Sequence, residues 1–221
     1  MLVPFGRIMK AIFHTSFLLL LAAFSLSAQN PAKGFYELSR AEKQWVWLHP
    51  FIAKKAFHCT QRARFVTDSL QKNGILKDGN GGQLDAFRHA YWMALLTQKI
   101  SPAQAEKLGK AHEKGNYQDW KNGKTEDSLR ADSMMCEMDL KNNLSGIDLG
   151  KKFRSDTSVT KKSLEDEVLV AVKTGKLLII KKDNLGHWLD NSGRIINVAL
   201  YEQQWYIPKV LVRSDYKQAR N

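Results

Sequence analysis

The sequence predicts a mainly α-helical protein, a helical bundle with a small C-terminal β hairpin or three-strand appendage. Three observations favour this class. Apolar residues recur every three to four positions through most of the chain up to Gly175. Capping and breaking residues divide these periodic stretches into segments of helix length. After Gly175, the segments "KLLIIKK", "RIINVAL" and "WYIPKVLV" are short and rich in β-branched residues, with turn signals such as "DNSG" between them.

The chain begins with the features of an export signal. Arg7 and Lys10 precede the apolar run "AIFHTSFLLLLAAFSLSA", which ends in small residues. This layout is typical of a cleaved secretory signal. We therefore expect residues 1–28 to be a signal peptide cleaved after Ala28, and the mature protein to be secreted or periplasmic. A retained membrane anchor is the alternative, since the run approaches the shorter limit for spanning a bilayer. After cleavage we expect no transmembrane helix.

Residues 29–175 are expected to form the helical domain. "AEKQWVWLHPF" has apolar residues at helical spacing until Pro50 interrupts it. A second helical pattern runs from Ile52 to Gly74. The glycine-rich turn "KDGNGGQ" follows, and it lacks the G-K-[ST] ending of a phosphate-binding loop. A third helix contains "DAFRHAYWMALLT" and runs to about Lys99.

Three further helices are predicted in the same domain. Ser101 as N-cap and Pro102 at the first helical position begin the fourth helix, which we expect to end at Gly115. "YQDWKNGKTEDS" is then expected to be an exposed loop. The fifth helix covers "LRADSMMCEMDLKNNLSG" and is expected to close at Gly146, and "KKSLEDEVLVAVKTGK" predicts a last amphipathic helix. Residues 176–221 form the small β-rich C-terminal extension.

The chain is basic, with 34 Lys and Arg residues against 22 Asp and Glu residues. Residues 1–28 hold two basic and no acidic residues, so the mature chain would carry a net charge of +10. A basic exported protein is attracted to anionic surfaces, and we expect an anionic envelope component or phospholipid as partner. Because the positive residues are spread out and no Lys/Arg block is interleaved with aromatic residues, there is no strong nucleic-acid signal.

Two cysteines, Cys59 and Cys136, follow the predicted signal. In an oxidising compartment they could form one disulfide, and the alternative is two buried thiols. The sequence leaves both open. Because neither cysteine belongs to a C-x-x-C pair, they do not predict a structural zinc site.

Polar side chains interrupt the apolar faces of three predicted helices, in the segments "DAFRHAYW", "AHE" and "MDLKNN". Asp85 and His89 are four residues apart and share one helix face, as do Arg88 and Trp92. Burying so many polar atoms is unfavourable unless they bond to one another. We therefore expect the segments to meet in one pocket. Its residues are Asp85, Arg88, His89, Trp92, His112, Glu113, Asp139, Asn142 and Asn143.

Imidazoles, carboxylates, a guanidinium group and amides are suited to metal binding or to general acid–base catalysis. We interpret four of the residues as catalytic: His89, His112, Glu113 and Asp139. Four others are expected to bind substrate: Arg88, Asn142, Asn143 and Trp92. The cofactor is unknown, and a divalent metal would be held by Asp85, His89, His112 and Asp139. No H-E-x-x-H motif is present, so such a metal would be bound across several helices. The positive charge favours phosphoester or lipid-like anionic substrates of a hydrolase.

The same residues also have structural interpretations. Asp85 near a helix start is favoured by the helix dipole, and Asn142 and Asn143 could end their helix. The alternative function is a non-catalytic cell-envelope binding protein, in which the polar residues form a structural hydrogen-bond network. Whether the protein is an enzyme is left open by the sequence.

The three segments also carry a resemblance. "DAFRHAYW" at Asp85–Trp92, "AHE" at Ala111–Glu113 and "MDLKNN..G" at Met138–Gly146 resemble the motifs of an uncharacterised bacterial domain-of-unknown-function family. That family occurs in secreted proteins and at the ends of larger exported, toxin-like chains. The later "VAVKTGKL" is a softer match. This chain departs from the pattern at Lys141, where histidine is common, and at Ile147, where arginine is common. The resemblance implies that these residues form one site, and it implies no particular reaction.

Overall fold

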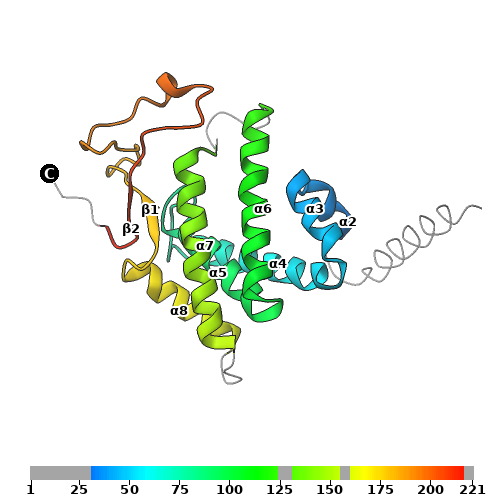
Figure 1. Ribbon diagram of the computed structural model, residues 1–221. Coiled ribbons are helices and arrows are strands. Elements are labelled where there is room, and N and C mark those ends of the chain that lie inside the picture. Colours follow the sequence, from blue (N-terminus) through cyan, green and yellow to red (C-terminus); the bar gives the residue numbers. More distant parts are fainter. Residues whose placement is uncertain (1–30, 124–130, 155–159, 217–221) are drawn as a thin grey trace, which may run out of the picture.

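A computed structural model of the protein describes residues 31–123, 131–154 and 160–216 (Figure 1). The predicted signal peptide, residues 1–28, lies outside the described residues. Within them the chain is mainly helical, with one small two-stranded antiparallel sheet near the C-terminus. The predicted fold class is confirmed. No helix in the described ranges is both long and apolar enough to cross a membrane.

From α3 to α8 the helices follow the order that the sequence predicts, and the preceding helix α2 was not predicted. The helices are α2 (Pro31–Glu37), α3 (Arg40–Leu48), α4 (Pro50–Lys72), α5 (Gln83–Lys99), α6 (Pro102–Lys121), α7 (Ser133–Arg154) and α8 (Lys161–Lys173). The strands are β1 (Leu178–Ile180) and β2 (Leu211–Arg213), and a short 3₁₀ turn covers Val198–Tyr201. Helix α4 begins immediately after the break at His49, with Pro50 in its first turn, where a proline is tolerated.

Helix α5 is the centre of the molecule. It contacts α4, α6, α7, α8 and strand β1, which surround it in Figure 1. Its residues are buried on nearly every side, and Phe87, Tyr91, Met93 and Leu96 are fully buried. A helix that is apolar all round is buried all round. A buried polar side chain on α5 is therefore within reach of partners on several neighbouring elements.

The predicted helix ends at Gly115 and Gly146 are wrong, because α6 continues to Lys121 and α7 to Arg154. Both glycines lie where another element comes close. A Cβ atom on Gly115 would lie 2.4 Å from the Ser39 hydroxyl, and one on Gly146 would lie 2.2 Å from the backbone oxygen of Ala90 in α5. Each glycine is therefore a point of close packing within a helix. The contact at Gly146 holds α7 directly against α5.

The small sheet closes the fold beside α5 and α7. Strand β1 pairs antiparallel with β2, with Ile179 opposite Val212. The predicted segment "RIINVAL" contains an isolated bridge and the 3₁₀ turn, so the three-strand alternative is not the arrangement observed in the described residues. Helix α7 fixes β1 through Asn142, whose side-chain amide donates to the backbone oxygen of Leu178 and accepts from its N–H, both at 2.9 Å.

The two cysteines are free thiols, and each is buried on a different helix. Burial raises the pKa of Cys59 in α4 to about 11. Burial also raises the pKa of Cys136 in α7, and the neighbouring Glu113 carboxylate raises it further. Of the two alternatives that the sequence left open, the structure has the buried thiols.

Candidate functional site

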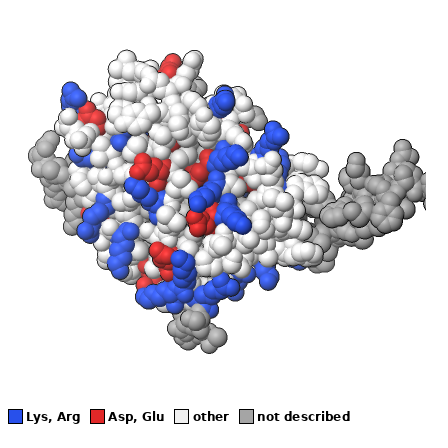
Figure 2. Space-filling model, in the orientation of Figure 1, with Lys and Arg blue, Asp and Glu red and all other residues white. Residues whose placement is uncertain are grey.

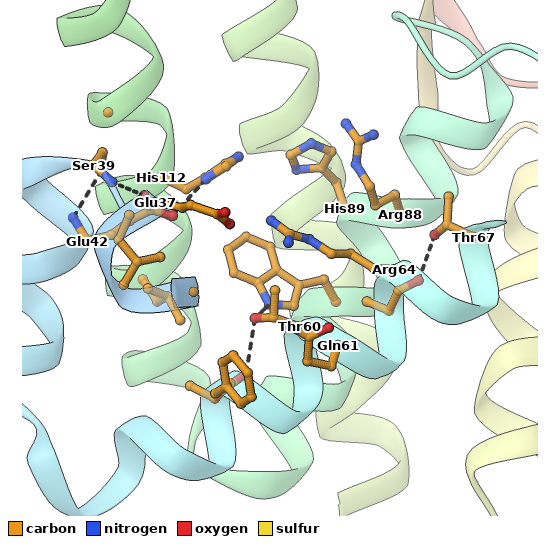
Figure 3. A pocket seen from close by; sticks show the side chains of 18 of the residues that line it. Glu37, Ser39, Glu42, Thr60, Gln61, Arg64, Thr67, Arg88, His89 and His112 are labelled. Carbon is orange, nitrogen blue, oxygen red and sulfur yellow. Dashed lines mark hydrogen bonds and ion pairs between the residues drawn. The ribbon is translucent and has the colours of Figure 1, made fainter. Parts of the chain in front are cut away.

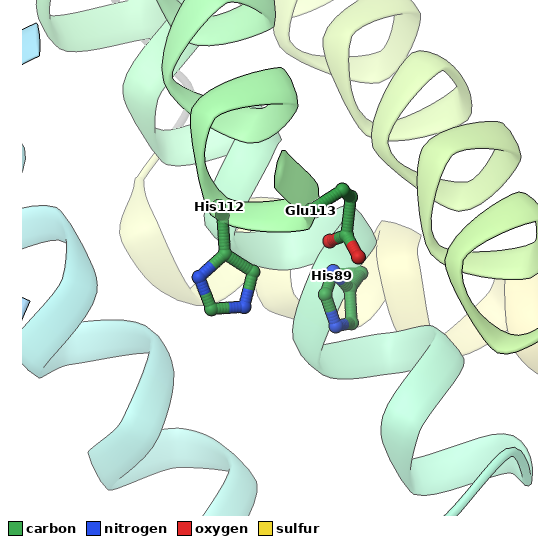
Figure 4. Close-up of side chains that lie close together, drawn as sticks. All are labelled: His89, His112 and Glu113. Carbon is green, nitrogen blue, oxygen red and sulfur yellow. The ribbon is translucent and has the colours of Figure 1, made fainter. Parts of the chain in front are cut away.

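Polar side chains from α5, α6 and α7 converge beside the centre of the bundle. The His89 and His112 ring centroids are 6.0 Å apart, although the residues lie on different helices. Glu113 points to the same place from α6, as Figure 4 shows with the two imidazoles. Asp139 and Asn143 reach His89 from α7. We call this group, together with Asp85, the polar cluster. Its residues are Asp85, His89, His112, Glu113, Asp139 and Asn143.

His89 is buried at the middle of the cluster, with its side chain 3% exposed. Its Nδ1 lies 3.3 Å from the amide oxygen of Asn143. Because an amide oxygen accepts hydrogen bonds, this contact favours the tautomer of His89 that carries the proton on Nδ1. Nε2 faces carboxylate oxygens of Asp139 at 3.4 Å and Asp85 at 3.7 Å. The lone pair of Nε2 is thus directed at two groups that are themselves acceptors.

Asp85 has a second role at the start of α5. One carboxylate oxygen accepts the Gly81 N–H at 2.8 Å, and the other pairs with Arg88 in the next turn. This is the favourable placement of an acidic group at a helix N-terminus. Gly81 has φ +72°, and a Cβ there would meet Ile180 at 2.9 Å, so glycine is required at this turn. Asp85 therefore both stabilises the helix start and belongs to the cluster.

His112 is held by a residue that sequence reasoning missed. Its Nδ1 lies 2.9 Å from Oε1 of Glu42 in α3. Glu42 is itself fixed by a capping box, in which its other oxygen accepts the Ser39 N–H at 2.9 Å. Burial raises the pKa of Glu42, but hydrogen bonds from His112 and Ser39 outweigh this and lower it to about 2. Since the Glu42 carboxylate accepts the Nδ1 proton, the other ring nitrogen of His112 is free to act as base or ligand.

Among the described residues, three buried polar atoms of the cluster have no hydrogen-bond partner: Glu113 Oε1, Asp139 Oδ1 and Asn143 Nδ2. The second oxygen of Glu113 accepts from Asn116 at 3.0 Å. Buried polar atoms are almost always satisfied in folded proteins. The cluster is therefore incomplete as a hydrogen-bond network of protein groups alone.

The pKa values of the cluster residues also indicate that its charges are not balanced. Burial raises the pKa of Asp139 well above its ordinary value, and the charges of Asp85 and Glu113 raise it further. Burial likewise raises the pKa values of Asp85 and Glu113, although Arg88 and His112 oppose this. Burial, with Arg88 and His112, lowers the pKa of His89 well below its ordinary value. A neutral imidazole thus stands among three carboxyl groups that compete for protons.

The structure contains two sets of residues with the spacing of metal ligands. They share His89: one is His89, His112 and Glu113, and the other is Asp85, His89 and Asp139. Within each set the ligand atoms lie within 4.8 Å of one another. Nitrogen and oxygen ligands bind Zn²⁺ at about 2 Å, so atoms on one ion are at most about 4 Å apart. Small side-chain movements would bring either set onto a cation.

One wall of the cluster opens into a large pocket, with a volume of about 1070 Å³. The pocket lies between α2–α3, α4, α5 and α6, and Figure 3 shows His89, His112, Arg88 and Arg64 around it. The Arg88 side chain is 42% exposed despite its pairing with Asp85. Trp92 forms part of the wall, donates its Nε1–H to Thr60 at 2.9 Å and meets the His112 ring edge to face. A ligand in this pocket would reach both imidazoles and both arginines.

Eight of the nine residues predicted to share a pocket lie together in this region, and Asn142 does not. Its side chain points to β1, where both amide atoms are bonded to Leu178. Its predicted contact with substrate has no geometric support. Among the pocket residues that were not predicted are Glu42 and Arg64. The S-x-x-E pattern at Ser39–Glu42 indicates a capping box, and nothing in the sequence connects it to His112.

Fold and cluster together define a mainly helical protein with a buried histidine–carboxylate cluster beside a pocket. A family model described as a domain of unknown function (DUF6973) matches residues 43–176, more than half of the chain, and the chain belongs to this family. The expectation of an uncharacterised family is confirmed. Its association with bacterial secreted and toxin-like chains stays a prediction. No curated protein and no solved structure has a significant match to the chain.

Proposed function

We propose that the protein is a hydrolase that cleaves phosphoester substrates with the help of a divalent metal ion bound at the polar cluster. The observation that carries this proposal is the environment of His89 Nε2. Its lone pair faces two carboxylates, and Asp139 Oδ1, 3.4 Å away, has no hydrogen-bond partner in the part of the chain that the structure describes. Acceptor groups directed at one another in a buried space repel unless a proton or a cation lies between them.

A closed structural network explains the cluster less well. Asn142 is an example of such a network, because each of its amide atoms has one backbone partner. The cluster differs in that Glu113, Asp139 and Asn143 each keep an unpartnered atom. A divalent cation would satisfy carboxylate oxygens and supply the missing positive charge. This contrast favours a ligand site over the alternative of a non-catalytic binding protein.

The residues would have separate roles in the reaction. His89 and Asp139 are metal ligands, with Asn143 holding the His89 ring in the required tautomer. Glu42 orients His112, which lies at the pocket wall with its side chain 34% exposed and can exchange a proton with a bound substrate. A divalent metal there would polarise a phosphoryl oxygen and lower the pKa of a bound water.

The pocket also has groups for an anionic substrate. Arg88 and Arg64 approach it from α5 and α4, beside the two imidazoles (Figure 3). Guanidinium groups bind phosphate through paired charge-assisted hydrogen bonds. Arg88 is already held by Asp85, so its position is fixed before substrate arrives. Arg64 is exposed on α4, also lines the pocket, and would supply a second guanidinium group to the phosphate.

The test combines metal binding with hydrolysis. Purified protein is stripped with a chelator, titrated with Zn²⁺ or Mn²⁺ by calorimetry, and assayed with bis-p-nitrophenyl phosphate. We expect about one ion per chain and activity that the chelator abolishes. Asp139→Asn keeps the shape of the side chain and should weaken metal binding at least 10-fold, the effect expected of a lost metal-site group. The matched control is His187→Ala, an exposed histidine outside the pocket.

The variant His112→Ala separates chemistry from metal binding. It should lower turnover at least 100-fold, the usual contribution of a general acid or base, with only a small change in the melting temperature. Wild-type protein that binds no divalent ion would exclude the proposed metal site. Bound metal without hydrolysis of any phosphoester would exclude the proposed reaction and leave the site standing.

A further inference from the structure

The turn between α3 and α4 exposes large apolar side chains. Trp47 is 52% exposed, Leu48 is 77% exposed and Phe51 is 91% exposed. We call these three residues the elbow patch. They lie within five positions of one another, on the two sides of the break at His49 and Pro50. Single exposed apolar residues are ordinary, whereas a group of large ones next to a pocket marks an interaction surface.

In the sequence, the elbow patch lies in a basic stretch that is bounded by Glu42 and Asp68. Residues 43–67 contain five basic residues and no acidic residue, although the whole chain has 22 acidic residues. Lys54 and Lys55 are exposed in α4, directly after Phe51. Elsewhere on the surface, basic and acidic groups alternate, as Figure 2 shows for one face. Aromatic and apolar side chains bordered by lysines are suited to the interface of an anionic bilayer.

The elbow also forms one end of the pocket. Trp45 and Val46 line the pocket, while the next two residues belong to the elbow patch outside it. In α4, Lys54 and Phe57 line the pocket one to two turns after Phe51. Near the elbow the lining includes the apolar side chains of Trp45, Val46 and Phe57. His89, His112 and Arg88 line the pocket from α5 and α6. A molecule that spans the pocket would place an apolar part near the elbow and an anionic part at the polar cluster.

We infer that the elbow patch docks onto an anionic phospholipid bilayer, and that the pocket behind it receives a phospholipid from that surface. Trp47, Leu48 and Phe51 enter the interface, where tryptophan is favoured. Lys54 and Lys55 bind the headgroups. Docking onto the bilayer is independent of whether the protein is an enzyme. The further step, that the phospholipid is the substrate, rests on the proposed function.

The test places an environment-sensitive dye at the patch of the full chain, by Phe51→Cys. The native thiols do not compete, because Cys59 and Cys136 are only 5% and 8% exposed. On vesicles with phosphatidylglycerol the dye emission should shift to the blue, and it should not shift on pure phosphatidylcholine. The matched control is a dye at Leu200→Cys, a residue 70% exposed in the C-terminal extension. Both labelled proteins contain the apolar residues 1–28, so membrane binding by that segment would be the same in both. The dye responds only to the surroundings of the residue that carries it, so a blue shift at position 51 alone indicates insertion of the elbow patch.

Two further variants separate the apolar and the electrostatic contributions. Trp47→Ser combined with Leu48→Ser should lower vesicle partitioning at least 10-fold, because the inserted apolar area is lost. Lys54→Glu combined with Lys55→Glu should lower it by about fivefold or more for each residue. The control Lys72→Glu with Lys77→Glu changes two exposed lysines at or beyond the other end of α4 and should have less effect.

The outcomes distinguish docking from chemistry. An unshifted dye at position 51, or serine variants that partition like the wild type, would overturn the docking proposal. If vesicle binding depended only on the salt concentration and on the net charge of the protein, it would be a non-specific attraction of a basic protein to an anionic surface. That result would also overturn the docking proposal. Vesicle docking without phospholipid hydrolysis, in a protein that cleaves the soluble phosphodiester, would overturn only the lipid as substrate. Loss of both hydrolytic activities with docking intact would instead contradict the proposed function.

Discussion

Two regions of the molecule bury ionisable groups, and they do so differently. Where the C-terminal extension meets α7, Lys209 Nζ donates to Asp132 Oδ2 with the lysine side chain fully buried. The other oxygen of Asp132 accepts the N–H groups of Met134 and Met135 at 2.9 and 3.1 Å. The lysine also lies over the Trp188 ring. Every charged oxygen and the ammonium group in this closed pair has a partner.

In the polar cluster, the buried carboxyl groups are not matched by an equal number of positively charged partners. Three carboxyl groups surround a histidine whose pKa is lowered, and buried atoms of Glu113, Asp139 and Asn143 have no hydrogen-bond partner within residues 31–123, 131–154 and 160–216. Burial alone therefore does not distinguish a structural ion pair from a candidate site. The distinguishing feature is whether the buried groups satisfy one another. A closed pair should lose stability when it is broken, and an open cluster should tolerate or gain from the loss of one charge.

Breaking the closed pair should have the largest effect. Lys209→Met keeps much of the side-chain volume but leaves Asp132 buried without its counter-charge. Removing one partner of a buried ion pair typically costs about 3 kcal/mol or more. Urea unfolding at pH 7 measures this as a lower free energy of unfolding. Lys173→Met, at an exposed position in α8, is the control and should change it little. Equal effects of the two variants would contradict a structural role for the pair.

Asp139→Asn in the open cluster should change the free energy of unfolding less than Lys209→Met does, and should raise it rather than lower it. Removing one of three competing carboxyl groups should raise the free energy of unfolding of metal-free protein by about 1 kcal/mol at pH 8. Because the folded-state pKa of Asp139 is raised, the native protein binds more protons than the unfolded chain. The stability of the wild type relative to this variant should therefore fall as the pH rises above the ordinary value of 3.8.

The measurement is urea unfolding of both proteins from pH 4 to pH 8, with a chelator present. Asp148→Asn, an exposed position on the same helix, is the control and should show no such dependence. Adding the divalent ion should stabilise the wild type more than the variant. A large loss of stability in Asp139→Asn at high pH would mean that the cluster is a structural network.

The helices and most of the pocket could be predicted from local patterns. Spacing at three to four residues locates α4 and α8, and the four-residue separation of Asp85 and His89 puts both on one face of α5. The glycines misled the prediction at helix ends. Gly115 and Gly146 occur where a stop signal is expected, but their lack of a side chain serves contacts with Ser39 and Ala90. Such contacts depend on which helix lies opposite, and no local pattern encodes that.

The same limit explains the errors within the site. Asn142 and Asn143 are adjacent in the sequence, yet the helix directs one to Leu178 and the other to His89. Glu42 is 70 residues from His112 and meets it only because α3 packs against α6. Local periodicity shows which residues share a face, whereas tertiary packing decides what that face meets.

The pair of Glu42 and His112 is intermediate between the closed pair and the open cluster, because its groups bond to each other but are only partly buried. Its loss should have the smallest effect on stability that can still be measured. Glu42→Gln should cost about 1 kcal/mol of stability at pH 7, since the contact is partly exposed. The pKa of Glu42 is lowered to about 2, so its contribution is present above the ordinary value of 4.5 and is lost as the pH falls toward 2. The variant should also lower the pKa of His112, whose hydrogen bond to Glu42 raises it. NMR titration of His112 and urea unfolding between pH 2.5 and 7 measure both effects, with Glu106→Gln on α6 as control. If the pKa of His112 is unchanged in Glu42→Gln, then Glu42 caps α3 without positioning the imidazole.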